Sequence, residues 1–292
     1  MKITNRHNLP WALVKAARRD NYSRGASRKS VTQLISSPRI DILREKYASQ
    51  MEADVTDRIW ALLGSAVHYL LEQGAAEDHT PEERLFADCN GWIISGAVDV
   101  QHEDGVPGII DYKVTSVYSV MYDKPEWEYQ LNAYAYLVWA TKGIKIEKLQ
   151  ICAILRDWRR SDADKNDLSY PQQPIMLVDV PVWPQEKQVA YLTERVKLHQ
   201  QAATAAEFDS ELPLCTDDDR WIRSAKWAVF KPGGKRATKI VGSEEEAINE
   251  AQKLGGRVEK RGGEPKRCTG NYCGVAEWCS QWQSELAMTD DN

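Results

Sequence analysis

The segments Gly96-Ala-Val-Asp99 and Ile109-Ile-Asp111-Tyr-Lys113 decide the expected fold of this chain. They lie in two short runs that are rich in β-branched residues, Trp92 to Val100 and Gly108 to Val114. The stretch His102-Glu103-Asp104-Gly105 between the runs is typical of a turn. The two runs are therefore predicted to be neighbouring antiparallel strands.

Three charged side chains would meet on these strands. Asp111 and Lys113 are two residues apart, so both leave the same face, and Asp99 ends the preceding strand. Two carboxylates can share a hard cation, which prefers oxygen ligands. A metal ion beside a lysine suits phosphodiester cleavage, because the ion lowers the pKa of bound water, stabilises developing charge and orients the phosphate. An isolated Asp-x-Lys is more often a surface ion pair, so the neighbouring elements matter.

Helices on either side of the strands add further polar groups. Apolar residues recur at helical spacing from residue 30 to about residue 73, which places His68 on a long helix. A second helix is expected from Pro125 to a break near Gly143. On this helix Gln130 and Tyr134 are four residues apart and share one face.

The order of the remaining elements predicts a mixed α/β core. Strands are expected at Lys148 to Leu155 and at Ile175 to Val182, and a charged helix follows from Pro184 to about Ala205. The order helix, strands, helix, strands, helix gives a first domain over residues 1–210, with a basic N-terminal segment.

Residues 211–292 are expected to form a small second domain. Trp227 to Phe230 and Ala237 to Val241 read as a hairpin, and Ser243 with Glu246 forms a capping box that opens a helix to about Leu254. This ββα element has few apolar residues, so a metal staple would give it a physical reason to stay folded.

The cysteines of the second domain are candidate metal ligands. Cys268, Cys273 and Cys279 fall within twelve residues, and Cys215 lies upstream. Disulfides are rare in cytoplasmic proteins, and four thiolates suit either a 4Fe–4S cluster or a tetrahedral zinc ion. Packing of three unligated thiols is the remaining interpretation. The other two cysteines, Cys89 and Cys152, read as core residues.

Charge is distributed unevenly along the chain. The formal net charge is -5, yet residues 1–46 carry 11 basic against 3 acidic side chains and residues 223–267 carry 12 against 6. Two basic ends could steer a phosphate backbone toward an acidic, cation-binding middle. No run of eighteen apolar residues and no signal pattern occurs, so we expect a soluble cytoplasmic protein with no membrane partner.

Four motifs, taken in chain order, resemble those of the PD-(D/E)XK nuclease superfamily, and specifically its RecB-like branch. They are Gly64-Ser-Ala-Val-His68, Gly96-Ala-Val-Asp99, Asp111-Tyr-Lys113 and Gln130-Leu-Asn-Ala-Tyr134. That branch includes nuclease domains of RecB-type recombination enzymes, CRISPR-associated RecB-like exonucleases and phage recombination exonucleases. The resemblance covers roughly residues 30–200, and Val98 stands where the superfamily has its name-giving proline. It implies a restriction-endonuclease-like core and a DNA exonuclease of recombination, repair or phage DNA processing.

The resemblance also implies a role for each motif residue. The metal ligands, for magnesium or manganese, would be His68, Asp99, Asp111 and the backbone carbonyl of Tyr112. Lys113 would be the catalytic lysine, and hydrolysis would form no covalent enzyme intermediate.

Two helix residues and two glutamates complete the expected site. Gln130 would orient the lysine or the attacking water, and Tyr134 would contact the DNA backbone or brace the site. Glu82 or Glu83 could add another carboxylate, although an exposed Glu-Glu-Arg run is more often only solvated.

RecB-like exonucleases also suggest the iron-sulfur interpretation of the cysteines, since some hold a cluster with one upstream cysteine and a C-terminal triplet. The pattern differs here, because Cys215 follows the nuclease motifs and the first gap of the triplet is four residues instead of two. Iron-sulfur and zinc therefore both remain open.

Two other functions compete with the nuclease. One is a non-catalytic or partner-activated DNA-binding protein that retains the fold. The other is a metal-stapled module, residues 211–282, that binds a recombination partner protein, which is compatible with nuclease activity. No Walker-type glycine loop is present, so no helicase is expected in this chain.

Overall fold

The structure is a computed structural model that describes residues 1–19, 23–74, 76–102, 105–122, 124–165, 169–222 and 225–290. Of the turn expected at residues 102–105, Glu103 and Asp104 lie outside the described residues. The chain divides into two compact units. Unit 1 comprises Met1–Ser36 and Ala48–Glu211, and unit 2 comprises Ser37–Tyr47 and Leu212–Asn292. The short segment Ser37–Tyr47, expected in the first domain, thus groups with the C-terminal part of the chain.

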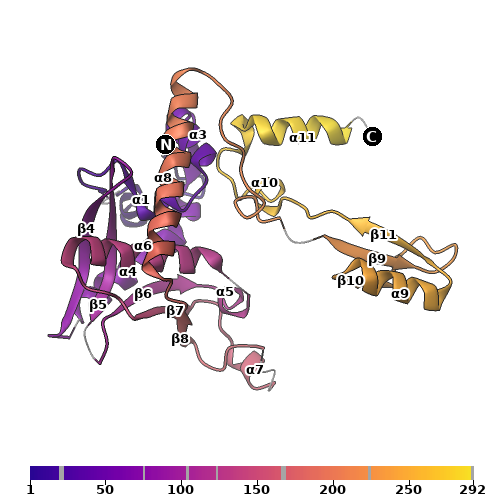
Figure 1. Cartoon of the computed structure of the whole chain (residues 1–292), viewed down its shortest axis with the longest axis horizontal. Coiled ribbons are helices and arrows are strands. Elements are labelled where there is room, and N and C mark those ends of the chain that lie inside the picture. Colours follow the sequence, from indigo (N-terminus) through magenta and orange to yellow (C-terminus); the bar gives the residue numbers. More distant parts are fainter. Residues whose placement is uncertain are drawn as a thin grey trace. The chain divides into compact units, whose positions relative to one another are not determined.

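Unit 1 contains a six-stranded mixed sheet in which helices and strands alternate along the chain (Figure 1). Its strands are β2 (Lys29–Ser30), β4 (His79–Cys89), β5 (Trp92–His102), β6 (Gly108–Thr115), β7 (Lys148–Leu155) and β8 (Ile175–Val180). Its main helices are α4 (Ile59–Gln73), α6 (Pro125–Lys142) and α8 (Gln185–Glu207). The shorter helices are α2 (Val31–Leu34), α5 (Tyr118–Met121) and α7 (Arg160–Ala163). The expected mixed α/β class is confirmed.

Strand β5 is the hub of this sheet. It pairs antiparallel with β4 along its length, parallel with β2 near its start and antiparallel with β6 near its end. Strands β6 and β7 run parallel, as their connection through α6 requires, and β8 is antiparallel to β7. The predicted antiparallel pairing of the two motif-bearing strands is therefore confirmed.

The core of unit 1 lies between the sheet and helices α2, α6 and α8. Leu131 and Leu137 of α6 and Leu192 of α8 are fully buried against strand residues such as Ile109 and Ile151. Helix α6 begins at Pro125 and ends at Gly143, whose φ of 72° suits a glycine C-cap. Both ends of this helix were predicted from the sequence.

A small N-terminal layer precedes the sheet in unit 1. Strands β1 (Lys2–Thr4) and β3 (Glu52–Asp54) pair in parallel, and α1 (Trp11–Arg18) and the 3-10 helix η1 (Val55–Arg58) accompany them. The expected long helix that carries His68 is α4, but the region of helical spacing from residue 30 to residue 73 is not helical throughout, because β3 interrupts it. Periodicity could not reveal β3, since its partner strand lies about fifty residues upstream.

Unit 2 combines a ββαβ element with short helices. The element comprises β9 (Lys226–Phe230), β10 (Lys239–Val241), α9 (Glu244–Leu254) and β11 (Arg257–Arg261). The helices are α3 (Pro38–Lys46), α10 (Lys266–Thr269), the 3-10 helix η2 (Ala276–Trp278) and α11 (Ser280–Asp290). The predicted hairpin and helix are present, but the third strand, β11, was missed because its sequence Arg-Val-Glu-Lys-Arg carries a single apolar residue.

The start of α9 matches its expected cap only in part. The Ser243 hydroxyl accepts a hydrogen bond from the backbone N–H of Glu246. The Glu246 carboxylate instead lies 3.4 Å from Lys239, so the reciprocal half of the predicted capping box is not formed. Within the described part of the chain, no helix is both long enough and apolar enough to cross a lipid bilayer.

Candidate active site and cysteine pocket

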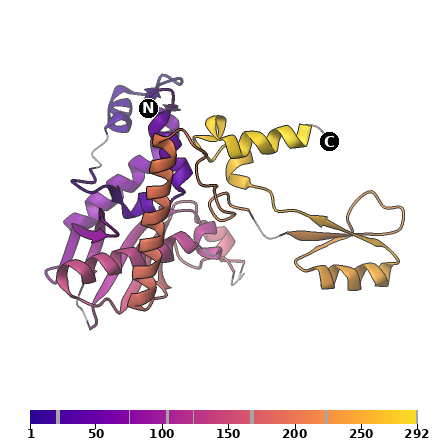
Figure 2. The ribbon, with the colours of Figure 1, turned by 45° about the horizontal axis from the view of Figure 1, so that its top comes forward.

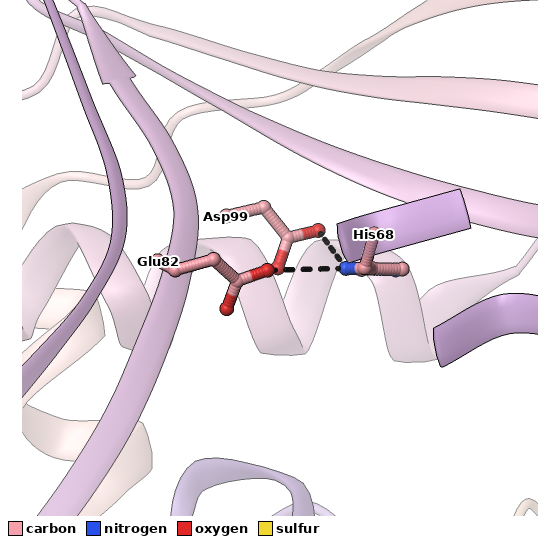
Figure 3. A group of neighbouring side chains, drawn as sticks. All are labelled: His68, Glu82 and Asp99. Carbon is pink, nitrogen blue, oxygen red and sulfur yellow. Dashed lines mark hydrogen bonds and ion pairs between the residues drawn. The ribbon is translucent and has the colours of Figure 1, made fainter. Parts of the chain in front are cut away.

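Three side chains from separate elements of unit 1 converge on one point (Figure 3). His68 comes from α4, Glu82 from β4 and Asp99 from β5, and their ligand atoms all lie within 4.8 Å of one another. Nδ1 of His68 lies 3.4 Å from Oε1 of Glu82 and 3.5 Å from Oδ2 of Asp99. The side chains of His68 and Glu82 are about a third exposed, so an ion can reach them from solvent.

The backbone of Glu82 is unusual for a residue within a strand. Its φ is 47°, a left-handed conformation that few residues other than glycine adopt. In the register of β4 and β5, Pro81 pairs with Val100 and Glu83 with Val98, so Glu82 faces Asp99 across the ladder. Residues held in such conformations concentrate at functional sites, because the surrounding structure must stabilise the strain.

Electrostatics in this triad favour a bound cation. Burial, and then the nearby charge of Asp111, raise the pKa of Asp99 to about 7. The hydrogen bond with Glu82 raises the pKa of His68 above its usual value. Carboxylates so close together repel each other when ionised, and a divalent cation would relieve this repulsion.

Strand β6 presents alternate residues to two different helices. Asp111 faces α6, where Nε2 of Gln130 donates to its Oδ1 over 3.0 Å. The Tyr112 ring instead meets the His68 ring of α4 edge to face. The backbone of Tyr112 binds both neighbours, since its N–H donates to Oδ2 of Asp99 over 2.8 Å and its carbonyl oxygen lies 3.0 Å from Nε2 of His68.

A second set of contacts starts at Asp111, which is only 1% exposed. Nζ of Lys113 lies 2.6 Å from Oδ2 of Asp111, and Nε2 of Gln130 also donates to the hydroxyl of Tyr134 over 2.9 Å. The side chain of Lys113 is about a quarter exposed. Tyr134 packs on Gly96, where a Cβ would come within 2.6 Å of the tyrosine ring.

The donor set of this site fits magnesium or manganese. Carboxylate oxygens are the ligands that these cations prefer, and the site adds one imidazole nitrogen. Oδ2 of Asp111 is buried and lies 2.6 Å from Nζ of Lys113, whose charge compensates it although no hydrogen bond forms. The fit to a metal ion therefore rests on the donor set of His68, Glu82 and Asp99.

The structure brings the expected residues together in two adjoining groups. His68, Asp99 and Tyr112 lie in the first group, and the second consists of Asp111, Lys113, Gln130 and Tyr134. Sequence reasoning underrated Glu82, since Glu82-Glu83-Arg84 was interpreted as a possible solvated run and β4 was not predicted. The stretch from His79 to Cys89 could have drawn attention to Glu82, because it directly precedes the predicted strand at Trp92 and pairs with it in the structure.

The four cysteines of the C-terminal region line one pocket within unit 2. Cys215, Cys268, Cys273 and Cys279 surround it together with Ile40 of α3, Arg220 and Arg267. Burial raises the pKa of Cys215 to about 11, and burial also raises the pKa of Cys268. The thiols of Cys215 and Cys268 are thus protonated at neutral pH, and binding of a metal would have to displace their protons.

Helix α3 anchors the loop that carries Cys215. The hydroxyl of Ser37 lies 3.1 Å from Sγ of Cys215. Arg39, only 1% exposed, donates hydrogen bonds to the carbonyls of Leu212 and Pro213 and to the hydroxyl of Ser280. Arg39, which precedes His68 in the sequence, therefore helps to organise the cysteine pocket, although it is not itself a cysteine.

Comparison with known proteins does not identify a family. No protein-family model matches the chain, and no curated protein matches it. The crystal structure of SSO0001 is 17% identical with a TM-score of 0.41, over 64% of this chain and 84% of that one. The crystal structure of a "putative exonuclease" from Eubacterium rectale is 11% identical with a TM-score of 0.33, over 70% and 76%. Both TM-scores are too low to establish a common fold, so function is argued from the site.

Proposed function

We propose that this chain is a metal-dependent deoxyribonuclease that hydrolyses phosphodiester bonds in DNA. The observation that carries the proposal is the convergence of His68, Glu82 and Asp99 within 4.8 Å, beside the Asp111–Lys113 pair. The four-motif resemblance to RecB-like nucleases supports the finer assignment to an exonuclease of recombination, repair or phage DNA processing.

Some residues of the site would bind metal ions, and Lys113 would act on the attacking water and the phosphate. His68, Glu82, Asp99 and Asp111 would hold one or two Mg²⁺ or Mn²⁺ ions, with the carbonyl of Tyr112 as a further ligand. Such an ion supplies an activated water and stabilises charge on the phosphate. Lys113 lies beside Asp111 with a partly exposed side chain, so it would position the attacking water and stabilise the charge that develops on the scissile phosphate.

Gln130 and Tyr134 would keep this arrangement in place. The Gln130 amide binds Asp111 and Tyr134 at once, which fixes the orientation of the carboxylate that faces Lys113. The 3.0 Å contact from Gln130 therefore acts on the reaction through Asp111, and Gln130 is a positioning residue.

We further propose that the cysteine pocket holds a 4Fe–4S cluster. Tetrahedral zinc with Zn–S bonds of about 2.3 Å draws its sulfur atoms to roughly 4 Å from one another. Among the described residues, no three cysteine sulfurs lie within 4.8 Å of one another. A four-iron cluster sits between its thiolates and holds them further apart than a single zinc ion does, and some RecB-like exonucleases hold such a cluster with four cysteines. Iron and zinc analysis of the protein purified without oxygen would decide, and stoichiometric zinc without iron would overturn this assignment.

Cleavage of linear and covalently closed circular DNA tests the main proposal. Wild type and Asp111→Ala are compared in magnesium, manganese and EDTA. Metal-dependent loss of linear DNA alone, abolished by Asp111→Ala, is the expected result, and cutting of closed circles would change the assignment to an endonuclease. A folded, metal-loaded wild type that binds DNA but cuts neither form would favour the non-catalytic or partner-activated alternative.

A further inference from the structure

The ββαβ element of unit 2, Lys226–Arg261, separates its charges between two sides. Helix α9 packs on one face of the three-stranded sheet, against Val229, Val241 and Val258 (Figure 2). That helix carries four of the element's five carboxylates, Glu244, Glu245, Glu246 and Glu250. The helix side of the element is therefore the acidic side.

The opposite side of the sheet is basic. Side chains alternate along a strand, so Lys226 of β9 points away from the face that Trp227 and Val229 present to α9. By their register partners, Arg257 and Arg261 of β11 share the face of Lys226. The loop between β9 and β10 adds Lys231, Lys235 and Arg236, all exposed. These six residues are called the basic surface here, and residues 226–243 contain no Asp or Glu.

Most of these cations lack a compensating carboxylate. Among the described residues, Arg257 pairs with Glu259 at 3.2 Å, whereas the other five members have no carboxylate within 4.0 Å. Lys226 and Arg261 are direct register partners, so two like charges face each other across the ladder. Such a cross-strand pair destabilises a sheet on its own, and an anion bound between the two side chains would reverse that effect.

The charge balance of the chain points the same way. The ββαβ element carries 9 basic and 5 acidic side chains, a net charge of +4, which leaves -9 for the rest of a chain whose total is -5. An acidic body repels a polyanion, so a DNA-processing protein of this composition needs a locally basic contact. The basic surface provides such a contact in unit 2, because five of its six cations have no carboxylate partner among the described residues and Glu259 is its one acidic neighbour on the strands.

We propose that the basic surface binds the phosphate backbone of duplex DNA without regard to sequence. This inference rests on the proposed nuclease function and assigns the substrate a second contact, outside the carboxylate site. Exposed lysines and arginines bind phosphates mainly by releasing condensed counterions, so the contact must weaken steeply as salt rises. The acidic helix α9 on the other side leaves one face of the element for DNA.

The test measures binding of the full chain to a short blunt-ended duplex in EDTA, where no cleavage occurs, over a series of salt concentrations. The variant Lys231→Ala/Lys235→Ala/Arg236→Ala removes the loop cations. A matched control, Lys2→Ala/Lys165→Ala/Lys253→Ala, removes three exposed lysines that are each paired with a carboxylate. Both variants change the net charge equally, so only the place of the charge differs.

In the loop variant, the plot of the logarithm of the binding constant against the logarithm of the salt concentration should be less steep by up to roughly 3, since each lost phosphate contact contributes about 0.9 to the steepness. The control should keep the wild-type slope. Equal slopes and equal affinities in the two variants would overturn the proposal, as would wild-type binding of polyglutamate in place of duplex DNA. If the wild type binds DNA through this loop but does not cleave it, the DNA-binding proposal stands and the proposed nuclease function fails. If cleavage is normal but the two variants have equal slopes, the nuclease function stands and the DNA-binding proposal fails.

Discussion

The carboxylate site of unit 1 and the cysteine pocket of unit 2 are organised by different means. In unit 1 the paired strands β4, β5 and β6 fix Glu82, Asp99 and Asp111 through their backbone ladders. In unit 2 the cysteines lie in loops and in or at the ends of short helices, and the hydrophobic cluster of the ββαβ element has four buried residues. A site fixed by a sheet can exist before its ion binds, whereas a site built from loops would be ordered by the metal that we propose for it.

Lys113→Ala tests the ordered site of unit 1 with the largest expected effect. Loss of the ammonium beside Asp111 should reduce the cleavage rate about 10³-fold, within the range for a positioned proton-transfer or charge-stabilising group. The thermal midpoint should hardly change, because the side chain is partly exposed. Lys148→Ala, an exposed lysine at the start of β7, is the control, and cleavage equal to that of this control would remove Lys113 from the mechanism.

Glu82→Gln separates two adjacent glutamates that the sequence could not distinguish. Glu82 faces Asp99 and His68, so its loss should raise the manganese concentration for half-maximal cleavage by about 10- to 100-fold, as for other groups that support a metal site. Glu83→Gln is the matched control, because Glu83 binds Lys142 and Gln101 instead. A shift of the same size in both variants would show that general charge, and not ligation, is responsible.

Cys273→Ser tests the metal dependence of unit 2. The variant should lose most bound iron or zinc and the visible absorbance of a cluster, and unit 2 should become more sensitive to protease. Cys152→Ser is the control, since Cys152 lies on β7 of unit 1. Full metal content and unchanged protease resistance in Cys273→Ser would contradict the cluster, and the unit would then be held by packing alone.

Much of unit 1 could be predicted because its signals are local. Pro125 and Gly143 mark both ends of α6, and alternating β-branched residues mark β5 and β6. The positions of Asp99, Asp111 and Lys113 followed from a strand period of two residues. These features need only neighbouring sequence to be recognised.

The features that escaped prediction depend on distant partners. Strand β3 exists because it pairs with β1, and Glu82 joins the site because β4 pairs with β5 and bends its backbone there. The grouping of Ser37–Tyr47 with the cysteines rests on Arg39, whose hydrogen-bond partners lie more than 170 residues away. No periodicity within a short window contains this information.

Gly96→Ala tests whether packing, and not only ligation, holds the carboxylate site in place. A Cβ at Gly96 would come within 2.6 Å of the Tyr134 ring and 2.9 Å of Leu137, and such overpacking costs about 1–3 kcal/mol. The ring must move, which should loosen the contact of Tyr134 with Gln130 and lower cleavage modestly. Gly64→Ala is the control, because nothing lies within 4 Å of its added Cβ and alanine favours the helix by about 0.5–1 kcal/mol. If Gly96→Ala were as stable and active as Gly64→Ala, Tyr134 would not brace the site, and the rigidity attributed to unit 1 would come from its strand ladders alone.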